Sequence, residues 1–132
     1  MSILSGILGT GSHGTPTTDS NSSITNWGDG SPVREFLYVK DAAKAIKISI
    51  NAESDLEPIN IGTGVGTSIK ELADLTAKYM NYQGELKWDT SKPNGVMRKV
   101  LDVTKMKSKF PDFMPISFEE GLRQTISWYL KN

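Results

Sequence analysis

Apolar residues recur at the three-and-four spacing of an amphipathic helix in two segments, residues 69–80 and 118–130. The first predicted helix buries one face, made of Ile69, Leu72, Ala73, Thr76 and Met80. The second buries Phe118, Leu122, Ile126, Tyr129 and Leu130. Each segment opens on Ser-x-x-Glu, at Ser68 and Ser117, a capping box that satisfies main-chain amides at a helix start. The pattern therefore predicts two helices, and Asn81 ends the first.

Two further helices and three strands complete the predicted pattern. The strands are short and rich in branched or aromatic residues: 34–39 (REFLYV), 58–61 (PINI) and 85–88 (ELKW). Asp41 is expected to cap a helix over residues 42–50, although alternating isoleucines there leave a strand open. Asp102 is expected to cap a shorter helix that ends before Pro111. The order of elements indicates an α/β fold, a small mixed domain with about three short strands and four helices.

The chain divides into two compositional regimes. Residues 1–24 contain almost nothing to bury and are predicted to be a flexible, low-complexity leader. Residues 25–132 are predicted to form one domain, with Trp88, Trp128 and Tyr129 in its core.

Composition narrows the class of function. Fifteen basic residues balance fifteen acidic ones, so no overall field attracts nucleic acid or an anionic membrane. The absence of cysteine excludes disulfides and thiolate zinc sites, and the single histidine, His13, excludes a histidine-rich metal site. No apolar run approaches the roughly 20 residues of a membrane span. The N-terminus lacks the positive region of a signal peptide, so we expect cytoplasmic residence.

Two glycine-rich stretches invite comparison with dinucleotide-binding loops. Residues 9–14, GTGSHG, have the G-x-G-x-x-G spacing, but no buried strand precedes them and no amphipathic helix follows. Residues 62–66, GTGVG, do lie between a predicted strand and a capped helix, but their spacing is G-x-G-x-G. We interpret the second stretch as a strand-to-helix turn and the first as part of the leader.

Three segments carry a resemblance to a known family. They are residues 27–46 (WGDGSPVREFLYVKDAAKAI), residues 57–107 with their INIGTGV turn and SKPNG loop, and residues 116–130 (ISFEEGLRQTISWYL). In this order they resemble the C-terminal portion of the extended short-chain dehydrogenase/reductase family, the NAD-dependent epimerases and dehydratases. Within it they look most like the GDP-L-fucose synthases. The resemblance covers about residues 25–132, and we expect none over residues 1–24.

The resemblance implies a nucleotide-sugar-binding portion without its Rossmann domain. A complete family member holds NADP(H) and a catalytic Tyr-x-x-x-Lys in that domain, whereas Tyr38 and Lys44 are six positions apart here. We therefore expect no catalytic, cofactor-binding or metal-binding residue in this chain. The reaction that such enzymes perform is C3/C5 epimerisation of a GDP-4-keto-6-deoxymannose, followed by NADPH reduction of the keto group.

The resemblance also implies substrate contacts on the first matching segment. Arg34 corresponds to the arginine that contacts the substrate diphosphate, and its alternative role is a surface ion pair with Glu35 or Asp41. Trp27 corresponds to a tryptophan beside the substrate, and its alternative role is to anchor a loop.

The SKPNG loop implies a second basic contact to phosphate. The candidate residues are Lys92, Arg98 and Lys99, and the alternative is that they are solvated side chains. Asn94 stands where the GDP-L-fucose synthase pattern usually has aspartate, which puts one sugar or base contact in doubt.

Two hypotheses follow. In the first, the chain binds a nucleotide sugar, with GDP-linked sugars first, and is not catalytic alone. In the second, it is a truncated or split-gene fragment that acts as a partner-binding module, meeting a Rossmann-domain chain or a second copy of itself through exposed apolar surface.

Overall fold

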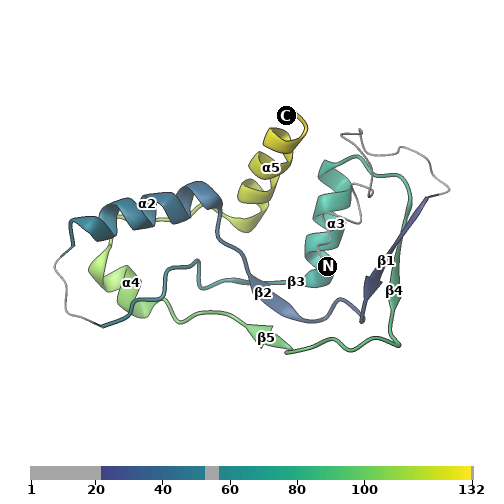
Figure 1. The fold of residues 1–132 in the computed structure, drawn as a ribbon, viewed down its shortest axis with the longest axis horizontal. Helices are drawn as coiled ribbons and strands as arrows, with labels where there is room; N and C mark the ends of the chain where they lie inside the picture. The colour runs from purple at the N-terminus through teal and green to yellow at the C-terminus, as the bar shows by residue number, and fades with distance from the viewer. Residues whose placement is uncertain (1–21, 53–56, 132) are drawn as a thin grey trace.

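The computed structural model describes residues 22–52 and 57–131, which form four helices and five strands (Figure 1). The helices are α2 (Val39–Ile50), α3 (Ile69–Tyr79), α4 (Thr104–Lys109) and α5 (Phe118–Tyr129). The strands are β1 (Ser23–Trp27), β2 (Val33–Glu35), β3 (Gly66–Ser68), β4 (Glu85–Asp89) and β5 (Arg98–Lys99). The predicted α/β class and the four helices are confirmed. Three strands were expected and five are present among the described residues. Strands β1, β3 and β5 were not predicted, whereas the strand predicted over residues 58–61 does not form.

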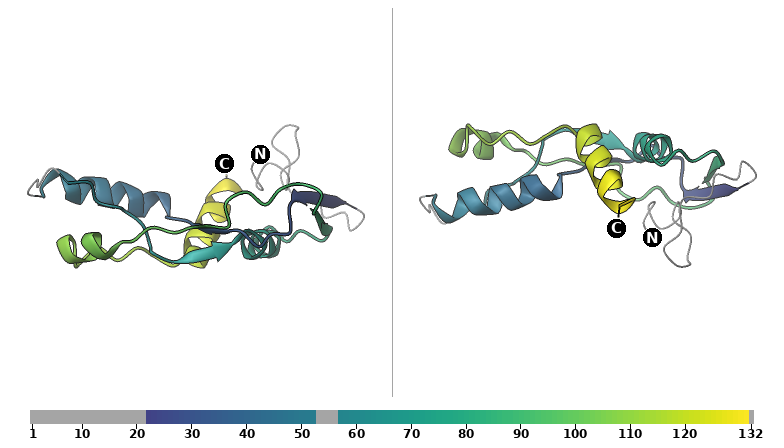
Figure 2. Two further views of the ribbon diagram at one scale, coloured as in Figure 1. Left: turned by 90° about the horizontal axis from the view of Figure 1, so that it is seen from below. Right: turned by 90° about the horizontal axis from the view of Figure 1, so that it is seen from above.

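The strands make two small sheets. β1 pairs with β4 in parallel, from Ser23 opposite Glu85 to Trp27 opposite Asp89. β2 is the centre of the second sheet, antiparallel to β3 on one side and parallel to β5 on the other. Figures 1 and 2 show the result as a flat, elongated body, with α2 and α4 towards one end and β1 and β4 towards the other.

The apolar core lies between α3 and α5, as their spacing predicted. Met80, Leu122 and Ile126 form its buried cluster. Around it pack five partly buried residues: Ile24, Leu72, Leu75, Tyr79 and Phe118. Both predicted caps form, because the Ser68 and Ser117 hydroxyls accept from the amides of Glu71 and Glu120 at 3.0 and 3.3 Å. The predictions that Trp128 and Tyr129 belong to the core, and that Leu130 lies on the buried face of α5, are wrong: these side chains are 65%, 38% and 51% exposed. Trp128 lies on the side of the helix away from Ile126, and Tyr129 and Leu130 lie at its C-terminal end.

Asp41 does not cap α2, contrary to the sequence-based expectation. The helix begins at Val39, three residues before the predicted start at residue 42, and the carbonyl of Tyr38 accepts from the amides of Asp41 and Ala42. The Asp41 side chain is buried and turned elsewhere. Its Oδ1 meets Lys44 Nζ at 2.9 Å, and its Oδ2 accepts from the Ile116 amide, 75 residues away, at 2.9 Å. Asp41 therefore ties α2 to the segment before α5.

Two predicted strands differ from the structure. The strand expected over residues 34–39 is only β2, because Phe36 leaves the sheet to pack its ring against Phe118, with centroids 5.1 Å apart. Residues 58–61 belong to no sheet of the described residues. A strand needs a neighbour as well as a pattern, and the described chain provides none for this segment. The strand predicted over residues 85–88 is confirmed as β4.

The carboxylate of Glu35 joins three parts of the second sheet. Its Oε1 accepts from the amides of Thr63 and Gly64, at 2.6 and 3.1 Å, and its Oε2 accepts from the amide of Leu101 at 2.8 Å. The close approach requires Gly62, since a Cβ there would lie 2.0 Å from Oε1. Glu35 thus holds the turn before β3 and the chain after β5 onto the end of β2.

The predicted leader, residues 1–24, lies outside the described residues except for its last three, and Ser23 and Ile24 of these belong to β1. Within the described chain, no helix has the length and apolar character needed to cross a membrane.

Replacing Asp41 by asparagine should destabilise the fold by about 1–3 kcal/mol at neutral pH, the range for breaking a buried charged hydrogen bond. Burial raises the pKa of Asp41, but the Ile116 amide and Lys44 outweigh it, so the net pKa is lowered. A lowered pKa means that this stability is present above the unfolded-state pKa and is lost as pH falls through the folded one. Urea unfolding should show the difference shrinking below about pH 4. Exposed Asp112→Asn is the control, and an equal effect there would contradict the assignment.

Replacing Glu35 by alanine should leave three amides without their acceptor and accelerate their hydrogen exchange. We expect Thr63, Gly64 and Leu101 to lose protection together, with a stability loss of about 1–3 kcal/mol. Glu35→Gln should lose part of this, because its amide group cannot accept from Leu101 while its oxygen serves the turn. Exposed Glu85→Gln is the matched control and should change stability by less than about 0.5 kcal/mol. Unchanged protection in Glu35→Ala would show that the turn is held by other contacts.

Candidate functional site

Two loops run side by side from the first sheet to the second. We call residues 28–32 and 90–97 the double loop. It begins where the Gly28 amide donates to the carbonyl of Asp89 at 2.9 Å, and it ends where the Val33 amide donates to the carbonyl of Met97 at 2.7 Å. The double loop therefore joins β1 to β2 and β4 to β5 as one paired unit.

The glycines of the first loop allow this close pairing. Gly28 and Gly30 both have φ near +78°, a conformation that side chains disfavour. At Gly30 a Cβ would also lie 2.7 Å from the ring of Trp88, which covers this turn. Trp88 was predicted to lie in the core. In the structure it is half-buried and packs on the Gly30 turn instead of between α3 and α5.

Trp27 and Lys92, both predicted site residues, come together across the double loop. Trp27 is the last residue of β1, and its side chain is 65% exposed. Lys92 Nζ lies 5.9 Å from the centroid of the Trp27 ring, within the range of a cation–π contact. The pair presents an open aromatic surface with a cation beside it.

Arg34 and Lys99 are neighbours on the second sheet. They are register partners in the parallel pair of β2 and β5. Side chains of directly paired residues point to the same face of a sheet, so the two cations share a face. Arg98 is the register partner of Val33 and lies on the opposite face, with its guanidinium near Gly66. The structure therefore brings Arg34 and Lys99 together and separates Arg98 from them.

The guanidinium of Arg34 has no carboxylate partner among the described residues. Its Nη1 donates to the carbonyl of Val33 at 2.8 Å. The ion pair that we weighed as an alternative role does not form, because Glu35 binds main-chain amides and Asp41 binds Lys44 and Ile116. The remaining guanidinium donors of Arg34 are thus available to an anion.

The G-x-G-x-G turn does not fit a cofactor pyrophosphate. A dinucleotide loop needs its amides free to donate to phosphate, but those of Thr63 and Gly64 already bind the Glu35 carboxylate. Strand β3 also separates this turn from the start of α3. Residues 62–66 do form a turn, but the interpretation of that turn as a strand-to-helix connection is wrong, because residues 58–61 form no strand and β3 follows the turn. The stretch at 9–14 lies outside the described residues.

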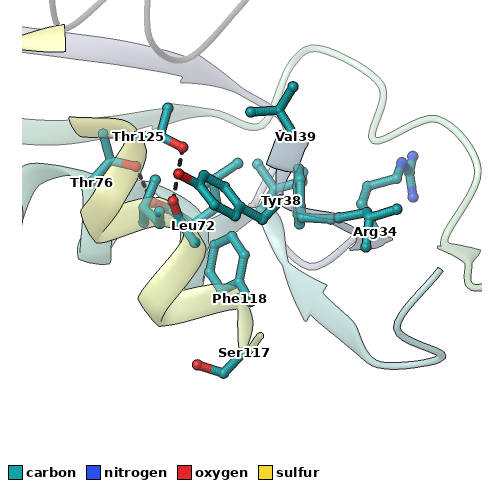
Figure 3. A pocket seen from close by; sticks show the side chains of 13 residues that line it. Arg34, Tyr38, Val39, Leu72, Thr76, Ser117, Phe118 and Thr125 are labelled. Carbon is teal, nitrogen blue, oxygen red and sulfur yellow. Dashed lines mark hydrogen bonds between the residues drawn. The ribbon is translucent and has the colours of Figure 1, made fainter. Parts of the chain in front are cut away.

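A separate apolar pocket lies between the β2–α2 connection, α3 and α5 (Figure 3). Its volume is about 490 Å³, and Tyr38, Leu72 and Phe118 are among its walls. Arg34 stands at its edge, and Figure 3 shows its guanidinium pointing away from the other labelled side chains. The sequence did not reveal this pocket, because its walls come from segments that are far apart along the chain.

Two acidic side chains near the site accept hydrogen bonds from main-chain amides of the double loop. The Asp29 carboxylate accepts from the Ser31 amide at 2.8 Å, and this contact with Ser31 is the main reason that the pKa of Asp29 is lowered. Asp89 accepts in the same way from Ser91. Across residues 22–52 and 57–131, no three His, Cys, Asp or Glu side chains gather closely enough to hold a metal ion.

Comparison with known proteins shows what this chain is similar to. Residues 12–62 match the model of the NAD dependent epimerase/dehydratase family. GDP-L-fucose synthase 1 of Arabidopsis thaliana is 45% identical over 110 residues, which are 83% of this chain and 33% of that protein. GDP-L-fucose synthase of Escherichia coli (strain K12) is 40% identical over 125 residues, covering 88% of this chain and 39% of that protein.

A solved structure agrees with these sequences. The crystal structure of a GDP-L-fucose synthetase from Naegleria fowleri superposes with a TM-score of 0.79 at 29% identity, over 84% of this chain and 34% of that one. The chain therefore spans about a third of the length of the relatives it matches. The family match begins at residue 12, so it reaches into residues 1–24, where we expected no resemblance. The chain is therefore similar to the NAD dependent epimerase/dehydratase family, and the relatives that it matches include GDP-L-fucose synthases.

Proposed function

We propose that this chain is the C-terminal, substrate-binding portion of a GDP-L-fucose-synthase-like nucleotide-sugar epimerase/reductase. The observation that carries the proposal is the pair of cations on one sheet face, Arg34 and Lys99, with no carboxylate partner for Arg34 among the described residues. The names of the sequence relatives favour a GDP-linked sugar as the ligand.

In this proposal the diphosphate lies against the face that Arg34 and Lys99 share. The planar guanidinium of Arg34 suits bidentate donation to phosphate oxygens, and Lys99 adds a compact positive charge beside it. Trp27 offers its exposed ring as a flat apolar surface, and Lys92 supplies a further cation next to that ring. Arg98, on the opposite face, is left out of this set.

In this proposal the described residues do not supply all the groups that the whole reaction needs. Hydride transfer by such an enzyme requires NADP(H) and a proton donor, and the one described glycine-rich turn has its amides occupied by Glu35. We propose that a Rossmann domain, in the remainder of a longer protein or in a separate chain, supplies both. The present residues would then bind and orient the substrate without catalysing its conversion alone.

A second candidate function is a partner-binding module, and a specific surface favours it. Helix α2 exposes three large apolar side chains, Val39 at 69%, Ile46 at 67% and Ile50 at 77%. Beside it, Ile61 lines a shallow apolar pocket together with Ala45, Ile46 and Ile50 of α2. An exposed apolar helix face is a surface that further protein would cover. A Rossmann-domain chain or a second copy are the partners that we propose.

Titration calorimetry with GDP tests the binding proposal. We expect the unmodified chain to bind GDP, and Arg34→Ala to weaken binding by about 10- to 150-fold, the effect of losing one charged hydrogen-bonding partner. Lys99→Ala should also weaken binding, whereas Arg98→Ala should have a smaller effect. Lys47→Ala, which removes an exposed charge from α2, is the control and should leave affinity unchanged. If the unmodified chain does not bind GDP, the fragment hypothesis is favoured.

Light scattering with an apolar-surface dye tests the partner surface. The unmodified chain should self-associate or bind the dye, and Ile46→Lys should reduce both, because it charges the exposed face of α2. Met114→Lys is the matched control, since Met114 is 82% exposed and lies between α4 and α5. A monomer that binds no dye would argue against the second candidate function.

A further inference from the structure

We infer that Asn94 is a positioning residue, whose side chain locks the loop after Trp27 onto the loop that carries Lys92. Its importance for ligand binding rests on the proposed function, whereas the lock itself is a property of the double loop. Asn94 was noted in the sequence only as a departure from the usual aspartate, and the structure gives that departure a physical role.

The contacts of Asn94 join the two loops directly. Its Oδ1 accepts from the amide of Asp29 at 2.9 Å, across 65 residues of sequence. Asn94 is half-buried, although its neighbours Pro93 and Gly95 are exposed, so its side chain is turned into the double loop. A Cβ at Gly28 would lie 2.1 Å from Oδ1, which means that Gly28 leaves the space that the carboxamide fills.

The lock holds the two candidate contacts in place. Asp29 lies two residues after Trp27, and Asn94 lies two residues after Lys92. The other main-chain links of the double loop are at its ends, from Gly28 to Asp89 and from Val33 to Met97. Asn94 therefore supplies the side-chain link near the middle, and it limits how far Lys92 can move from the Trp27 ring.

The neutral carboxamide suits this position because a carboxylate faces it. Asp29 is charged, and contact with the Asn94 side chain adds to that with Ser31 in lowering the pKa of Asp29. An aspartate at position 94 would keep the acceptor for the Asp29 amide but would place a second negative charge beside the first. Like charges this close disfavour each other, and the pair would also repel an incoming phosphate.

The test compares three variants of the whole chain: Asn94→Ala, Asn94→Asp, and Asn94→Asp combined with Asp29→Asn. The ring of Trp27 should shift the NMR signals of the Lys92 side-chain methylene groups, because Lys92 Nζ lies 5.9 Å from the ring centroid. Trp27→Ala defines the zero of that shift. Asn94→Ala should lose most of the shift and weaken GDP binding by about three- to tenfold, as expected for one hydrogen bond. Asn94→Asp should reduce the shift and weaken binding, because its carboxylate and that of Asp29 repel each other and push the two loops apart. The double variant should restore both the shift and the affinity, because it exchanges the amide and the carboxylate.

The two readouts separate the lock from the proposed function. If GDP does not bind the unmodified chain, the proposed function fails, and the Lys92 shift still decides on the lock. The inference is overturned if Asn94→Ala leaves that shift unchanged, or if Asp29→Asn fails to rescue Asn94→Asp although both variants unfold at the same denaturant concentration. General destabilisation would lower every readout but would not be reversed by adding Asp29→Asn.

Discussion

The hydrogen bonds of the Glu35 carboxylate are the contacts on which the second sheet depends. Strands β3 and β5 have only three and two residues, too few for their ladders alone to fix them. Glu35 binds the turn before β3 and the chain after β5, which lie 28 and 66 residues away from it in sequence. A single side chain at the end of β2 thereby sets the spacing of all three strands, and with it the position of Lys99 next to Arg34.

Elsewhere the molecule is held by side chains that reach the main chain of distant segments. Asp41 binds the amide of Ile116, and Asn94 binds the amide of Asp29. These contacts add to an apolar core whose buried cluster, within the described residues, consists of Met80, Leu122 and Ile126. Figure 2 shows that the body is flat. In a flat body few elements cover one another, and large apolar side chains of α2 therefore stay on the surface.

The sequence predicted best those features that depend on neighbours in the chain. Helices α3 and α5 follow from periodicity and from Ser68 and Ser117, and both caps are present. Predictions from the sequence were wrong where the partner of a side chain is distant in the chain. Asp41 was expected to cap a helix, yet it binds an amide 75 residues away. Nothing local indicates that β2 lies parallel to β5, so only the family resemblance suggested that Arg34 and Lys99 act together.

The alternation of a strand explains why adjacent opposite charges in β2 do not neutralise each other. Arg34 and Glu35 point to opposite faces because successive side chains of a strand do so. On one face, the Glu35 carboxylate accepts hydrogen bonds from three main-chain amides. On the other face Arg34 lies beside Lys99, a like charge that raises the local positive potential. Two like charges side by side repel each other, and an anion between them, such as the diphosphate of the proposed ligand, would offset that repulsion.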